Sequence, residues 1–174
     1  MIHALAAEII RQAAQAAGLP EGRVIDQPKA DNLTLPRPRL ELQFLPEKYR
    51  RSGRKLHIGR TREVQIRKRE LFTVDLSVAA NVLADNDAWL AGFCYDFTRL
   101  LPRGVNDSRG NWVKIQPEKA SFGRSAAPRV GSASIEVFHR INQLYHITFI
   151  WRVTDEEMEN LIQTFTINPI IKGV

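Results

Sequence analysis

The chain has 174 residues, of which 44% are hydrophobic, and a formal net charge of +6. This size suits one domain, and the apolar share is enough to build a core, which excludes a globally disordered chain. Cys94 is the only cysteine, so an intramolecular disulfide is excluded. The N-terminus shows no signal-peptide pattern and no apolar run approaches the roughly 18 residues of a membrane span, so we predict a cytoplasmic protein without a membrane partner.

The first predicted element is an alanine-rich helix over residues 2–17, because its apolar residues recur on one helical stripe. Gly18 is a natural end for this helix. A half-buried strand is predicted next, where Leu40, Leu42 and Phe44 alternate with polar residues.

The segment 48–69 holds ten of the 25 lysines and arginines of the chain. Residues 48–62 show no sustained period of 2 or 3.6, which predicts a long projecting basic loop. Residues 63–78 alternate as a long strand, and the part up to Arg69 is predicted to project as a hairpin. Removing the basic segment leaves a net acidic remainder, so the basicity is local.

A second helix is predicted over 86–101, with a wide core stripe and a capping residue among residues 85–87. A short strand follows at 112–116, and residues 117–133 are predicted to be irregular. The pattern of 134–153 predicts a hairpin with a two-residue turn at Asn142-Gln143 and apolar residues on both faces. The acids after Thr154 are typical of the first turn of a short helix.

These elements predict an α+β fold in a single domain over residues 1–174. Its sheet is expected to be mixed and mostly antiparallel, with a long projecting hairpin, and to be packed by the N-terminal and central helices. Residues 154–174 form a C-terminal extension in this interpretation.

The sequence holds no nucleotide-binding, zinc-protease, nucleophile-elbow or paired-cysteine motif. His139 and His146 would face each other across the predicted hairpin, but a zinc site needs three or four ligands and none lies nearby. Two half-buried imidazoles are the preferred interpretation, and Cys94 is interpreted as a core thiol. We therefore predict no enzyme activity, no cofactor and no metal site.

Three interpretations of the basic segment stay open: a solvated face, a nucleic-acid contact through phosphates, and docking onto an acidic protein surface. The third is preferred because a cationic arm pairs well with carboxylates. The partner-binding residues predicted on this loop are Lys48, Arg50, Arg51, Arg54, Lys55, Arg60 and Arg62.

The order of elements, together with the two-faced stretch SIEVFHRINQLYHITFIWRV, resembles the phage tail terminator (tail completion) proteins. The resemblance covers the chain from Ile2 to Val153. It implies a hexameric ring of identical subunits, and in such a ring one apolar hairpin face would pack on the neighbouring subunit. The interface residues expected on that face are Phe138, Tyr145, Ile147, Phe149 and Trp151.

The function implied by this resemblance is mechanical. A ring on the tail tube would stop tube polymerisation and offer a head-joining surface, with the tail-tube protein, a sheath protein and the head connector as partners. The protein would be cytoplasmic during assembly and then part of the virion tail. The alternative is a nucleic-acid-binding accessory protein that uses the segment 48–69.

Overall fold

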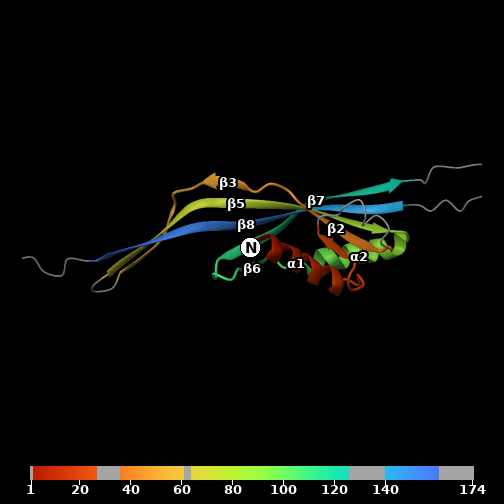
Figure 1. The fold of residues 1–174 in the computed structure, drawn as a ribbon, viewed down its shortest axis with the longest axis horizontal. Helices are drawn as coiled ribbons and strands as arrows, with labels where there is room; N and C mark the ends of the chain where they lie inside the picture. Colours follow the sequence, from red (N-terminus) through yellow and green to blue (C-terminus); the bar gives the residue numbers. More distant parts are fainter. Residues whose placement is uncertain (1, 27–35, 61–63, 126–139, 161–174) are drawn as a thin grey trace, which may run out of the picture. The chain divides into compact units, whose positions relative to one another are not determined.

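The computed structural model describes residues 2–26, 36–60, 64–125 and 140–160. Within these ranges it contains two helices and a mixed, curled sheet, which confirms the predicted α+β class (Figure 1). The elements are α1 (Ile2–Ala16), β1 (Val24–Asp26), β2 (Arg39–Phe44), β3 (Lys48–Arg51), β4 (Lys55–Arg60), β5 (Val64–Ala84), α2 (Asp87–Leu100), β6 (Gly104–Asn106), β7 (Trp112–Ser125) and β8 (Arg140–Asn160).

The strands follow the order β1-β2-β5-β8-β7-β6, and β3 and β4 also pair with β5. Strands β1 and β2 are parallel, while β2, β4, β6 and β7 take part in antiparallel pairs. The chain divides into two compact units. Unit 1 comprises Met1–Tyr49 and Val74–Trp151, and unit 2 comprises Arg50–Thr73 and Arg152–Val174.

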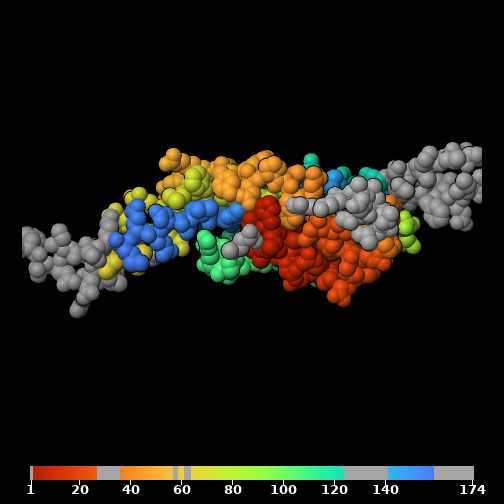
Figure 2. All heavy atoms as spheres, viewed as in Figure 1, coloured from red at the N-terminus to blue at the C-terminus, as the bar shows by residue number. Residues whose placement is uncertain are grey.

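Unit 1 contains a hydrophobic core between one face of its sheet and the two helices, which lie on the same side of the strands (Figure 1). The space-filling view shows α1, in red, packed beside the orange segment that contains β1 and β2 (Figure 2). Alanines on the buried face of α1 allow its backbone to approach the sheet closely. The buried residues include Ala6, Ile10 and Ala14 of α1, Phe93 and Phe97 of α2, Leu76 and Val78 of β5, and Ile147 and Phe149 of β8.

The end of α1 and the start of α2 lie where local sequence signals predict them. Gly18 has a φ of 98°, its amide donates to the Gln15 carbonyl, and the Leu19 amide donates to the Ala14 carbonyl. This pair of bonds closes the C-terminus of α1 through a left-handed glycine. Helix α2 begins after Asn86, whose Oδ1 accepts a hydrogen bond from the Trp89 amide at 3.1 Å.

The hairpin predicted over 134–153 is wrong at its turn, because β8 runs through that position as one strand. The expected turn, Asn142-Gln143, lies within a continuous strand, and Asn142 pairs with Gly123 of β7. The Asn142 side-chain amide also donates to Oδ1 of Asn81 on β5 at 3.1 Å. Because this polar side chain is satisfied inside the sheet, no chain reversal is needed there; residues 134–139 lie outside the described ranges.

Two further predictions are wrong. Residues 117–125, predicted to be irregular, continue β7, and their antiparallel pairing with β8 explains why small and polar residues are tolerated there. The remainder of the predicted irregular stretch, 126–133, lies outside the described ranges. The helix predicted after Thr154 is instead the last part of β8, which extends to Asn160.

Candidate interaction surface

In the described part of the basic segment, strands replace the predicted loop. β3 and β4 both pair with β5, and Gly53, with a φ of 70°, lies between them. The Gly53 amide donates to the Glu70 carbonyl and the Glu70 amide to the Arg54 carbonyl, each at 2.8 Å. All four residues of β3 are exposed, so its sequence carries no burial pattern that could reveal a strand.

We define the cationic strip as the five exposed basic residues that this arrangement gathers in unit 2. It has no acidic residue within its span, Arg50 to Arg60. Lys48 is exposed and belongs to unit 1, and Arg62 lies outside the described ranges. The strip consists of Arg50, Arg51, Arg54, Lys55 and Arg60.

Glu70 is the one buried side chain among the described residues of unit 2, with 4% of its surface exposed. Its carboxylate accepts a hydrogen bond from Thr73 Oγ1 at 2.6 Å and lies 3.3 Å from Nε of Arg152. The Thr73 bond lowers the pKa of Glu70, burial opposes this, and Ser52, Arg152 and Arg54 lower the pKa further. A carboxylate therefore fixes the β3–β4 turn against β5.

The acids of β8 meet the cations of β5 across the strand pair. Nζ of Lys68 lies 2.7 Å from Oε1 of Glu156, and Arg69 lies 3.9 Å from Glu157. The Lys68 hydrogen bond and charge lower the pKa of Glu156. By local pattern these acids are typical of a helix N-terminus, because such a pattern does not show that Glu156 has a partner 88 residues away. In Figure 2, blue β8 atoms lie against the yellow atoms of β5 in this unit.

Unit 2 has almost no hydrophobic interior among its described residues. Its apolar side chains are half-buried or exposed, and Met158 is 74% exposed. A ribbon of a few strands needs a packed apolar face to be stable by itself. Among its described residues, unit 2 therefore lacks the packed apolar face that such a ribbon needs. Its half-buried or exposed apolar residues include Leu56, Val64, Ile66, Leu71, Phe72, Val153 and Met158.

The predicted subunit interface on β8 requires correction. Tyr145, Ile147 and Phe149 are buried in the core of their own chain, so they have no surface left for a neighbouring subunit. Trp151 is half-buried against the same core, and Phe138 lies outside the described ranges. Tyr145, Ile147 and Phe149 belong to the same buried cluster as residues of α1 and α2, because the helices cover that face of the sheet.

His146 has a different cross-strand partner from the one predicted. Because β8 is continuous through the expected turn, His146 pairs with Lys119 of β7, and His139 lies outside the described ranges. Cys94 is half-buried on α2, and burial raises the pKa of its thiol. No group of three or more potential metal-ligating side chains occurs within the described ranges.

Comparison with protein-family models gave no match, and comparison with curated protein sequences gave none either. Neither helix of the described chain has the length and apolar content that a membrane span needs.

Proposed function

We propose that this chain is a non-enzymatic subunit of a phage or prophage tail terminator. It forms a ring, with six copies expected, on the end of the tail tube, stops tube polymerisation and provides the head-joining surface. The tail-tube protein is its first partner, and a sheath protein and the head connector are further partners. The chain would reach the virion tail after assembly in the cytoplasm.

One observation carries this proposal: unit 2 buries a single described side chain, Glu70, although its strands expose a row of charges and several apolar residues. Such a ribbon gains stability when neighbouring molecules cover it, as happens in an assembly of many subunits. Among the described elements, the order of an N-terminal helix, a strand, a long strand, a central helix and a short strand agrees with the layout on which the resemblance to tail terminators is based.

The cationic strip supplies the charge for contacts within that assembly. Five exposed cations attract a carboxylate-rich surface on an adjoining subunit and set its orientation. Exposed charges contribute little to stability of the chain itself, so their concentration in one strip favours a role in binding.

The test is growth of tail tubes in vitro. Purified chain is added to the polymerising tail-tube protein of the same phage or prophage, and tube lengths are measured by electron microscopy. The proposal predicts short tubes with a ring at one end. An unchanged length distribution in the presence of folded chain would contradict it.

A second candidate function is nucleic-acid binding, favoured by the same exposed cations. It predicts tight binding of duplex DNA that weakens steeply as salt rises, because phosphate contacts release counterions. Binding of this kind, combined with no effect on tube length, would replace the tail-terminator proposal.

A further inference from the structure

Unit 2 has two strand edges that lack a partner strand within the described ranges. β4 pairs with β5 on one side only. β7 pairs with β8 as far as Ile150, which leaves the outer edge of Arg152–Asn160 without a described strand. An open edge presents backbone N–H and C=O groups to another chain. Two such edges on one subunit allow each copy to contact two others.

The two edges carry opposite charge. The side formed by β3 and β4 has five cations and no acid between Arg50 and Arg60. The β8 edge has one arginine and four acids between Arg152 and Asn160. The edges therefore attract each other between copies, whereas two identical edges repel.

The cations of β4 lie on one face of the ribbon. Lys55 pairs with Arg69 of β5, and Arg60 pairs with Gln65. Residues 65 and 69 are four apart on a strand, so they share a face, and their cross-strand partners share it with them. Lys55 and Arg60 therefore both lie on the Arg69 face, although they are five residues apart, because the register shifts between Lys55 and His57.

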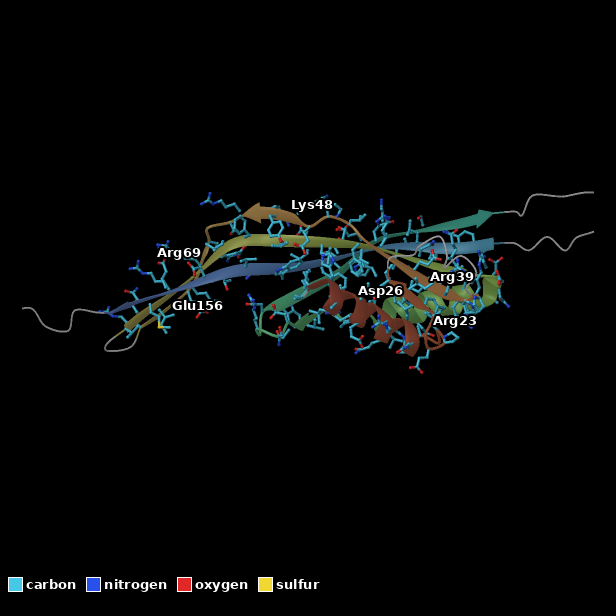
Figure 3. All side chains as sticks on the ribbon, in the orientation of Figure 1. Arg23, Asp26, Arg39, Lys48, Arg69 and Glu156 are labelled. Atoms are coloured by element: carbon cyan, nitrogen blue, oxygen red, sulfur yellow. The ribbon has the colours of Figure 1, made fainter. Side chains whose placement is uncertain are left out.

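The acids of β8 lie on that same face. Glu157 lies 3.9 Å from Arg69, which places Glu157 on the Arg69 face. Asp155 is on the same face, because residues two apart on a strand point to the same side. Glu156 points to the opposite side, as its side chain and that of Arg69 show (Figure 3). One face of unit 2 thus changes from cationic at β4 to acidic at the outer edge of β8.

We propose that the cationic β4 edge of one copy binds the acidic β8 edge of a second copy. This inference rests on the proposed ring and names the partner of the cationic strip: a sister chain rather than another tail protein. Cross-strand charge pairs between Lys55 or Arg60 and Asp155 or Glu157 fix the direction of the contact. Because the two edges differ, the contact is head-to-tail and closes into a ring when the rotation per subunit fits.

A charge-swap experiment on the full chain tests this contact. The first variant, Lys55→Glu with Arg60→Glu, has two acidic edges, and the second, Asp155→Lys with Glu157→Lys, has two cationic edges. Each variant alone is expected to lose at least about tenfold in self-association constant, measured by sedimentation velocity. An equimolar mixture is expected to regain association in complexes that contain both variants.

The control reverses two exposed cations of β7, Lys114→Glu with Lys119→Glu, and should associate as the wild type does. Circular dichroism checks the fold of each variant, and the neutral pair Lys55→Gln with Arg60→Gln replaces the first variant if it is unfolded. The neutral pair should also weaken association, by less than the charge reversal.

Three results would overturn the inference. The wild type could remain monomeric at its highest soluble concentration, each charge-reversed variant alone could associate normally, or the mixture of the two variants could fail to associate. Normal association of the single variants together with tube termination would leave the proposed function intact while removing this contact. Loss of DNA binding in the first variant without a change in association would assign the strip to nucleic acid instead.

Discussion

The hydroxyl of Tyr145, on the central strand β8, donates a hydrogen bond to the backbone carbonyl of Cys94 in α2 across 3.3 Å. The ring of Tyr145 also meets Phe97 edge-on, with ring centroids 5.3 Å apart. Burial raises the pKa of Tyr145 far above its ordinary value, and the contact with Cys94 adds to this. The neutral phenol therefore joins the sheet to the helix at every physiological pH.

Replacing Tyr145 with phenylalanine should lower the free energy of unfolding by about 1 kcal/mol, because the hydrogen bond is lost while the ring remains. Replacement with alanine should cost about 3–5 kcal/mol, since a large buried ring leaves a cavity. Urea unfolding measures both values. Equal losses for the two variants would show that the hydroxyl, not the ring, dominates.

Glu70→Gln should loosen the β3–β4 turn. The variant keeps an acceptor for Thr73 but loses the charge that faces Arg152, so the local opening free energy should fall by about 1–3 kcal/mol. Amide exchange at Gly53, whose N–H donates to the residue 70 carbonyl, reports this opening. Exchange at amides in the unit 1 core should remain unchanged.

The stabilisation from the contacts of Glu70 with Thr73 and Arg152 should weaken in acid. The pKa of Glu70 is lower in the folded chain than its ordinary value of 4.5, so the unfolded form binds the proton more readily. The stabilisation is present above pH 4.5 and is lost as the pH falls through the folded value. The difference between wild type and Glu70→Gln should therefore shrink below pH 4.5, and a constant difference would contradict this account.

Gly104→Ala should destabilise unit 1. A Cβ at this position would lie 2.6 Å from Cε2 of Trp112 and 2.7 Å from the Val113 carbonyl oxygen, and the backbone atom cannot move aside. We expect a loss of about 1–3 kcal/mol in thermal or urea unfolding. The matched control is Gly92→Ala on α2, where a Cβ meets no atom within 4 Å. This control should gain about 0.5–1 kcal/mol, because alanine favours the helix.

Asn86→Ala should cost about 1 kcal/mol, because the Trp89 amide at the start of α2 loses its acceptor. Asn86→Asp keeps an acceptor and adds a negative charge at the helix N-terminus, so it should match or exceed the wild type. Helix content and unfolding midpoints distinguish the two variants. An alanine variant as stable as the wild type would mean that water replaces the cap at no cost.

The helices and the class of the fold follow from signals that are local in sequence. Gly18 and Asn86 close and open their helices through bonds that span at most five residues, and the apolar stripes show which faces are buried. The strand β2 is also evident, because Leu40 and Leu42 on one of its faces are fully buried while Gln43 on the other is exposed.

The strands of unit 2 and the course of β8 do not follow from local pattern. β3 exposes every residue, so neither a period of 2 nor one of 3.6 arises. The Asn142-Gln143 pair looks like a turn because the partners that satisfy it are distant: Gly123 on β7 and Asn81 on β5.

The sequence predicts the cationic side of the candidate surface but not its acidic side. The concentration of lysine and arginine between residues 48 and 69 marks the cationic side without any structural knowledge. The acidic side depends on strand register, since only the pairing of β5 with β8 brings Glu156 and Glu157 beside Lys68 and Arg69.

Lys68 and Glu156 are 88 residues apart, and this separation sets the delay between their synthesis on the ribosome. At about 5–20 residues per second, β5 emerges several seconds before the carboxylates that neutralise it. The cations of β5 are therefore synthesised before the acids that pair with them, and the charge pairs of unit 2 form only after β8 has been translated.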